Sequence, residues 1–63
     1  MQKTLMGKEV IVFDTEEATF CEGIVVEHST VFLGIRKNSF SRRQYPVRDI
    51  ESGEFVVYVK EDF

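Results

Sequence analysis

The stretch TFCEGIVVEH, Thr19 to His28, combines Thr, Phe, Val and Ile with a single interior glycine, Gly23. A run of β-branched and aromatic residues predicts a strand, and a glycine inside a strand often marks a bulge or a sharp bend. No part of the chain has the pattern of a long helix. We therefore expect a fold built from short strands.

Four more runs of this kind lie on either side of the stretch. They are EVIVF (Glu9 to Phe13), TVFLGIR (Thr30 to Arg36), RQYPVRDI (Arg43 to Ile50) and EFVVYVK (Glu54 to Lys60). Pro46 places the fourth run at a sheet edge or a strand end, because proline has no amide hydrogen to donate. The runs recur roughly every ten residues, which predicts an all-β meander closed into a small five-stranded barrel.

Length and composition limit what such a fold can do. The 63 residues form a single domain, residues 1–63, with one small core. A chain of this size buries only about 60% of the surface exposed when it is unfolded, which leaves no room for a buried catalytic pocket. The single cysteine excludes an internal disulfide framework. Because the sequence lacks the apolar run of a signal peptide or a membrane span, we expect a cytoplasmic protein with no membrane partner.

Two segments carry a resemblance to known domains. GKEVIV followed by CEGIVVEH resembles the opening of SH3-like domains of the KOW and Tudor types, in which a Gly-x-x-Val-x-Val strand is followed by a loop and a Gly-x-Val strand. YPVRDI resembles the strand and short 3₁₀ turn that precede the closing strand of those domains. The resemblance covers most of the chain and implies a five-stranded SH3-like barrel. An OB-like barrel is the alternative, although it normally needs more residues and a helix. SH3-like barrels serve many unrelated functions.

The window IRKNSFSRRQYPVR, Ile35 to Arg48, holds five of the eight basic residues and no acid, in a chain whose net charge is −3. It should form a hairpin between the third and fourth runs, with Phe40 at the tip. Alternation along the third run places Val31, Leu33 and Ile35 on the core face.

The register of this hairpin must be an even one if Val31 and Leu33 are to pack against Tyr45 and Val47, and two choices meet this condition. In one, Leu33 lies opposite Tyr45 and Arg36 lies opposite Arg42. In the other, Ile35 takes that place and Lys37 comes near Arg43. Both set basic side chains across from each other, which costs stability unless an anion lies between them.

Three interpretations of this hairpin remain open. It can be a solvated edge whose charges prevent aggregation and pair with acids such as Glu22 or Glu54. It can contact the phosphates of RNA or DNA, with an aromatic ring stacked on a base, although a pI near 5.0 is unusual for such a protein. It can also bind a protein with an acidic surface, which we prefer to nucleic acid, because Arg and aromatic residues commonly anchor interfaces. The candidate contact residues are Arg36, Lys37, Phe40, Arg42, Arg43, Tyr45 and Arg48.

The segment FDTEEATF, Phe13 to Phe20, carries the acids Asp14, Glu16 and Glu17. We expect it to form the long loop between the first two strands, or a short helical turn begun by Asp14 or Thr15. Peptide-binding SH3 domains use an acidic loop at this place to recognise basic ligands, so these acids are a secondary candidate surface by analogy. The spacing lacks the glycine and terminal glutamate of a calcium loop, so we expect no metal there.

The last run is apolar on both faces. Phe55, Val57 and Val59 alternate with Val56 and Tyr58, which predicts either a central strand or one paired with another chain, and we favour the core position. Pairing through this edge would make a homodimer or a structural subunit of an assembly.

Catalytic chemistry is not indicated by the sequence. Cys21 and His28 are separated by an odd number of residues and would lie on opposite faces of one strand, and a zinc site needs about four ligands. We interpret Cys21 as a buried small hydrophobe and His28 as an exposed turn residue.

We therefore expect a non-catalytic binding module without a cofactor. The preferred version is a small modulator or inhibitor that docks a larger protein, such as a component of the nucleic-acid machinery. Stand-alone modules of this size are typical of compact phage or bacterial genomes.

Overall fold

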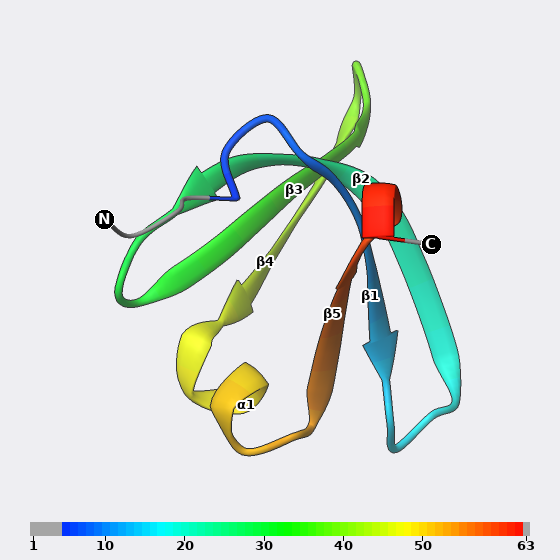
Figure 1. Cartoon of the computed structure of the whole chain (residues 1–63), viewed down its shortest axis with the longest axis vertical. Helices are drawn as coiled ribbons and strands as arrows, with labels where there is room; N and C mark the ends of the chain where they lie inside the picture. Colours follow the sequence, from blue (N-terminus) through cyan, green and yellow to red (C-terminus); the bar gives the residue numbers. More distant parts are fainter. Residues whose placement is uncertain (1–4, 63) are drawn as a thin grey trace.

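Strand β2 (Thr19–His28) is the central element of the fold, and it pairs with a different strand along each half of its length. The computed structural model describes residues 5–62. The other elements are β1 (Glu9–Asp14), β3 (Phe32–Asn38), β4 (Ser41–Pro46), the helix α1 (Val47–Glu51), β5 (Phe55–Val59) and the 3₁₀ helix η1 (Lys60–Asp62). The strands form one antiparallel sheet in the order β4-β3-β2-β1-β5, which confirms the predicted all-β class (Figure 1).

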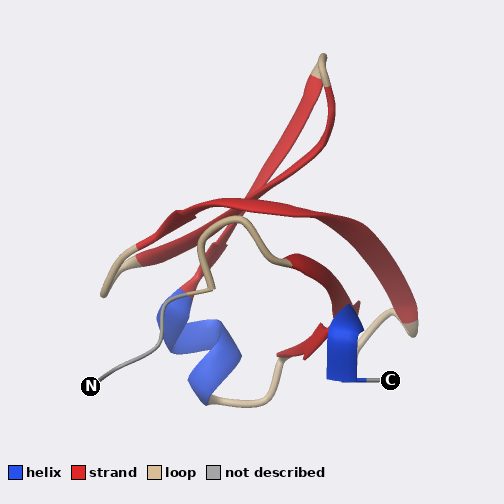
Figure 2. Ribbon diagram, turned by 45° about the horizontal axis from the view of Figure 1, so that its top comes forward, coloured by secondary structure: helices blue, strands red, loops and turns tan. Residues whose placement is uncertain are grey.

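The bend of β2 allows one strand to serve both halves of the sheet. Its first half pairs with β1 and its second half with β3, and the pairing shifts register between Val25 and Glu27. Figure 2 shows the strand as a long arch across the molecule. At Gly23 a Cβ would lie 2.8 Å from the carbonyl oxygen of Arg36, so glycine permits β2 and β3 to approach closely here. The predicted irregularity is thus confirmed, with the register shift just beyond Gly23.

The curled sheet wraps around one core. The buried residues are Val10, Val12, Cys21, Val25, Leu33, Ile35 and Tyr45, and Leu5, Ile50, Phe55, Val57 and Val59 pack against them. Within the described chain the edge strands β4 and β5 are not paired with each other. Helix α1 joins them, and the rings of Tyr45 and Phe55 meet edge to face with centroids 4.9 Å apart. Side chains thus close the side that backbone hydrogen bonds leave open.

Three features of the fourth run were expected, and one expectation was wrong. Pro46 is the last residue of β4, and β4 lies at the sheet edge, as predicted. The strand does not continue to Ile50, because Val47–Glu51 form α1. Proline fixes its own φ and suits the position just before a helix, so Pro46 ends the strand and begins the turn. The expected helical turn before the closing strand is therefore present as one turn of α-helix.

Other sequence-based expectations need correction. Val31 is 59% exposed instead of in the core, and it precedes the first residue of β3, Phe32. The loop between β1 and β2 is short, residues 15–18, because Asp14 and Thr19 are already paired. Strand β5 is an edge strand and not a central one.

Candidate protein-contact surface

The hairpin formed by β3 and β4 projects from the body of the molecule (Figures 1 and 2). Asn38 lies opposite Ser41, so only Ser39 and Phe40 form the turn. The side-chain oxygen Oδ1 of Asn38 accepts a hydrogen bond from the backbone amide of Phe40 at 2.9 Å. This contact is typical of turns that begin with Asn or Asp. Phe40 is 98% exposed, so its ring lies at the tip outside the core, as expected.

The register of the hairpin is one of the two that the sequence allowed. Leu33 lies opposite Tyr45, and Arg36 lies directly opposite Arg42. Because Leu33, Ile35 and Tyr45 face the core, Arg36 and Arg42 share the outer face. Two guanidinium groups on directly opposed positions repel each other, and no described carboxylate lies within ion-pair distance of either.

Lys37 and Arg43 complete the basic surface of the hairpin. Lys37 lies at an irregularity of the β3–β4 pairing, between Arg36 and Asn38. Arg43 is on the core side of β4, with its guanidinium carbon 5.4 Å from the centre of the Tyr45 ring. Neither side chain pairs with a carboxylate among the side chains that the structure describes.

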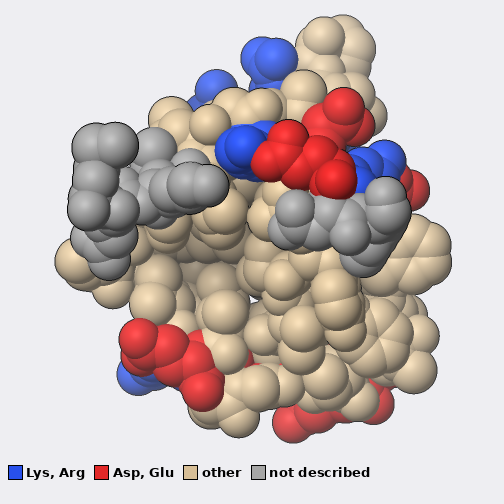
Figure 3. Space-filling view, in the orientation of Figure 1, with Lys and Arg blue, Asp and Glu red and all other residues tan. Residues whose placement is uncertain are grey.

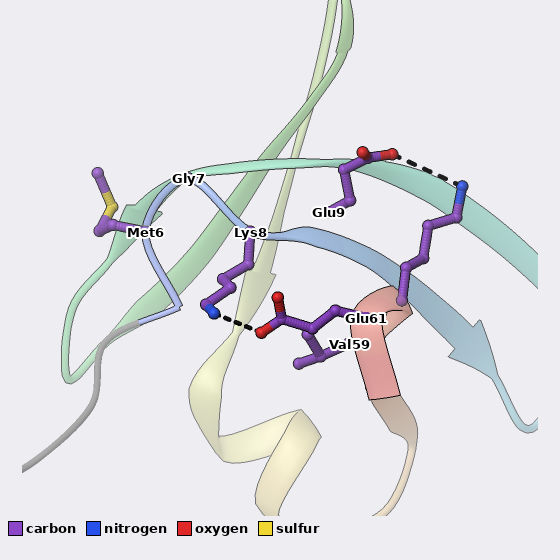
Figure 4. A pocket seen from close by; sticks show the side chains of 7 residues that line it. Met6, Gly7, Lys8, Glu9, Val59 and Glu61 are labelled. Atoms are coloured by element: carbon purple, nitrogen blue, oxygen red, sulfur yellow. Dashed lines mark hydrogen bonds and ion pairs between the residues drawn. The ribbon is translucent and has the colours of Figure 1, made fainter. Parts of the chain in front are cut away.

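Two lysines outside the hairpin form ion pairs with carboxylates. Lys8 pairs with Glu61, and Lys60 lies 2.5 Å from Glu22 and 3.8 Å from Glu9. Figure 4 shows Lys8 paired with Glu61 beside an open pocket, which Glu9 and Lys60 also line. The hydrogen bond and the charge of Glu22 raise the pKa of Lys60. Glu22, which was expected to neutralise the hairpin if the surface was a solvated edge, thus binds Lys60.

Two predicted contact residues lie elsewhere. Tyr45 is only 3% exposed, so its ring cannot stack on a base or on a partner, and this part of the prediction is corrected. Burial and a hydrogen bond with Cys21 raise the pKa of Tyr45 to about 12. Arg48 belongs to α1, where its Nε lies 3.8 Å from Asp49, away from the hairpin tip (Figure 1). The hairpin cations are therefore Arg36, Lys37, Arg42 and Arg43.

The side chains that lie next to Arg36 and Arg42 on the outer face could not be predicted from the sequence. Gln44 donates from Nε2 to Oε1 of Glu27 at 2.8 Å, on the same outer face of the sheet. An open groove of about 560 Å³ runs beside this contact and is also lined by Arg42. The only signal in the sequence was Gly34, which lies between Glu27 and Gln44 and leaves space for their side chains.

The acidic segment has a structural role at the other end of the molecule. Oδ1 of Asp14 accepts hydrogen bonds from the amides of Glu16 at 2.9 Å and Glu17 at 3.2 Å, which closes the β1–β2 turn. The hydroxyl of Thr15 donates to the carbonyl of Glu54 at 3.0 Å and so ties this turn to the segment before β5. Glu16 and Glu17 are exposed.

Charge is divided between the two ends of the molecule. In Figure 3 most of the basic side chains lie at the upper end, where acids are interspersed with them, whereas acids predominate at the lower end. Desolvation raises the pKa of Glu54, and the charges of Asp49, Glu16 and Asp14 raise it further, because these acids lie near one another.

Cys21 and His28 are the remaining residues that were considered for catalysis or metal binding. Cys21 is buried in the core, as expected, and His28 accepts a hydrogen bond at Nδ1 from the amide of Leu5 at 3.1 Å. Across residues 5–62 no three side chains of the types that bind metals are grouped suitably for an ion. The described helices are all too short or too polar to cross a membrane.

Comparisons of the chain with protein-family models, with curated proteins and with solved structures find no match. The contact surface must therefore be interpreted from its own geometry.

Proposed function

We propose that this protein is a non-catalytic binding module that docks the acidic surface of a larger protein through the β3–β4 hairpin. One observation carries the proposal: the four hairpin cations have no carboxylate partner in the described chain, whereas Lys8, Lys60 and Arg48 each have at least one. A molecule with a net charge of −3 has enough acids to neutralise these cations internally. Keeping them apart costs stability, and a partner with complementary charge would offset that cost.

The exposed Phe40 ring favours a protein as that partner. Interface hot spots commonly combine an aromatic anchor with arginine, and Phe40 stands between the arms that carry Arg36 and Arg42. Nucleic acid would require phosphate contacts strong enough to overcome repulsion from the acidic remainder of the chain. We assign the fold to the SH3-like barrels of the KOW or Tudor type, which is supported by the strand order and by the helical turn between β4 and β5.

The test is capture of a partner from a nuclease-treated bacterial lysate by immobilised protein. We expect Phe40→Ala and Arg42→Glu to abolish capture, and Arg48→Glu to retain it. Arg48→Glu is the matched control, because it makes the same charge reversal at an exposed site on α1. Circular dichroism should show the same fold for all variants.

Direct binding of nucleic acid is distinguished by a second measurement. Fluorescence anisotropy with labelled single-stranded DNA and RNA should show no binding at moderate salt. Tight binding that falls log-linearly with salt concentration and is lost in Arg42→Glu would replace the protein partner with nucleic acid. Capture that survives Phe40→Ala and Arg42→Glu alike would show that the hairpin is not the contact surface.

A further inference from the structure

The outer face of β5, β1 and β2 is largely apolar. Side chains that alternate with the core residues point to this face, and the register aligns them in rows across the three strands. One row joins Val56, Phe13 and Phe20, and the next joins Tyr58 and Ile11 with Glu22. Ile24 lies in the following row, next to Arg36. The sheet thus has apolar side chains on both of its faces.

This outer apolar face is open to solvent. Phe20 is 64% exposed, Tyr58 44% and Ile24 40%, and Ile11, Phe13 and Val56 between them are half-buried. A single-layer sheet normally has polar residues on its solvated face. Contiguous apolar groups on such a face are typical of a surface that packs against another protein.

Charges of opposite sign lie beyond the two ends of this face. At one end Arg36 and Arg42 follow Ile24 in the same cross-strand row. At the other end the β1–β2 loop, with the exposed acids Glu16 and Glu17, follows the row of Phe13 and Phe20. Figure 1 shows the hairpin and this loop at opposite ends of the molecule. Three charged residues are also on this face, where Lys60 pairs with both Glu9 and Glu22.

This order of charges is complementary to itself. If two faces pack together around a two-fold axis that lies between them and runs across the strands, the basic end of each copy covers the acidic end of the other. The middle row, with Tyr58 and Ile11, then packs against itself. The row of Phe13 and Phe20 covers the row of Ile24 in the other copy, as in a β-sandwich with sheets about 10 Å apart. A different protein would have to present acids opposite the arginine pair and basic residues opposite Glu16 and Glu17. A second copy of this chain already does so.

We propose that the protein forms a two-fold homodimer through the outer face of β5, β1 and β2, with Arg36 and Arg42 of each copy against Glu16 and Glu17 of the other. The proposal goes beyond the docking function, because it gives the arginine pair a second acidic partner, the other copy, which would compete with the larger protein for Arg36 and Arg42. Phe40 and Lys37 stay exposed at the tip in the dimer. Loss of lysate capture in Phe40→Ala with an intact dimer, or loss of the dimer with intact capture, would separate the two proposals.

Analytical ultracentrifugation of the full chain tests the apolar part of the interface. The wild type should sediment as a dimer that dissociates on dilution. Phe20→Asp should raise the dimer dissociation constant at least about tenfold, since a charge would replace an apolar ring inside the contact. Phe40→Asp is the matched control, because it makes the same change at an exposed Phe outside the face, and it should remain dimeric. If Phe20→Asp fails to fold by circular dichroism, Tyr58→Glu takes its place.

A charge exchange tests the two-fold arrangement. The variants Arg36→Glu/Arg42→Glu and Glu16→Lys/Glu17→Lys should each be monomeric alone, because both ends then carry the same sign. Mixed together, they should form a one-to-one heterodimer, in which every contact is again between opposite charges. A wild type that stays monomeric at every concentration, a Phe40→Asp variant that dissociates as readily as Phe20→Asp, or a mixture that does not associate would each overturn the proposal.

Discussion

Gly23 shows how one residue can determine the distance between two strands. A Cβ at this position would lie 2.8 Å from a backbone oxygen of Arg36, and the backbone of β3 cannot move away without disturbing its pairing with β4. At Gly34 the nearest atoms belong to the side chain of Glu27, at 3.0 Å and 3.1 Å. These contacts are longer than the contact at Gly23, so the neighbours of Gly34 need to move only by a few tenths of an ångström.

We therefore predict that Gly23→Ala lowers the free energy of unfolding by about 1–3 kcal/mol, and that Gly34→Ala lowers it less. Urea denaturation followed by circular dichroism measures both. Equal losses in the two variants would indicate that the approach of β2 to β3 is not the constraint.

Tyr45 also acts at the scale of a single residue. Its hydroxyl is in the core with Cys21, so the neutral form is favoured and the pKa rises from 10.0 to about 12. In the unfolded chain the hydroxyl ionises near its ordinary value, so between these two pH values the unfolded state binds fewer protons than the folded state. Stability that is complete below pH 10 is then lost as the pH rises towards 12.

The expected loss is at most about 2–3 kcal/mol between these limits. Urea denaturation at increasing alkaline pH should show this decline in the wild type and a shallower one in Tyr45→Phe. Some decline should remain in Tyr45→Phe, because the raised pKa of Lys60 means that its contribution is also lost at high pH. Parallel profiles for the two proteins would contradict the assignment.

At the scale of the element, repulsion between two side chains lowers the stability of the β3–β4 hairpin. Arg36 and Arg42 occupy directly opposed positions, and like charges there are unfavourable. We predict that Arg42→Glu stabilises the protein by about 0.2–1 kcal/mol, because it replaces repulsion with attraction. The same change should abolish partner capture, so stability and binding would move in opposite directions.

Urea denaturation at the lowest practical protein concentration measures this effect in the monomer. The gain should shrink as salt is added, since exposed charges are screened. Arg48→Glu is the control, and it should give no gain because Arg48 already lies beside Asp49. A destabilised Arg42→Glu would mean that an anion or a second molecule separates the two guanidinium groups.

An element could be predicted where neighbouring residues in the sequence determine it, and could not where contacts between distant residues determine it. Alternation limited the hairpin to even registers, and Pro46 was sufficient to predict that this run lies at a sheet edge or ends a strand. The choice between them depended on Leu33 meeting Tyr45 in a shared core, which is a property of the whole fold. The helix of Val47–Glu51 was indicated by resemblance alone, because its five residues are too few to show helical periodicity.

The candidate contact surface could also be predicted from the sequence only in part. The exposed Phe40 and the opposition of basic side chains follow from the sequence once the hairpin is recognised, whereas the pairing of Arg36 with Arg42 needed the register. The burial of Tyr45 against Phe55 does not, since these residues meet across the unpaired side of the sheet. The outer apolar face was visible only in part, as the two-sided character of β5, because the neighbouring rows depend on strand order.

For the whole molecule, the division of charge has consequences at both ends. The basic end has cations without internal partners, and the acidic end brings Asp14, Glu16, Asp49 and Glu54 close enough to affect one another. At each end, repulsion between like charges lowers the free energy of unfolding. A chain with so small a core has little stability to lose. Desolvation and these neighbouring charges raise the pKa of Glu54, so its ionised form is disfavoured in the folded state.

We predict that Glu54→Gln stabilises the protein near pH 7 and has no effect below about pH 4. The raised pKa means that the folded state holds the proton more tightly than the unfolded state. Ionisation therefore removes stability as the pH rises through the unfolded value and then the folded value, and the amide avoids this loss. The midpoint of urea denaturation should rise in the variant at neutral pH and converge with that of the wild type in acid. Glu51→Gln removes an exposed charge from the same end, on α1. An equal gain in Glu51→Gln would assign the effect to net charge and not to the surroundings of Glu54.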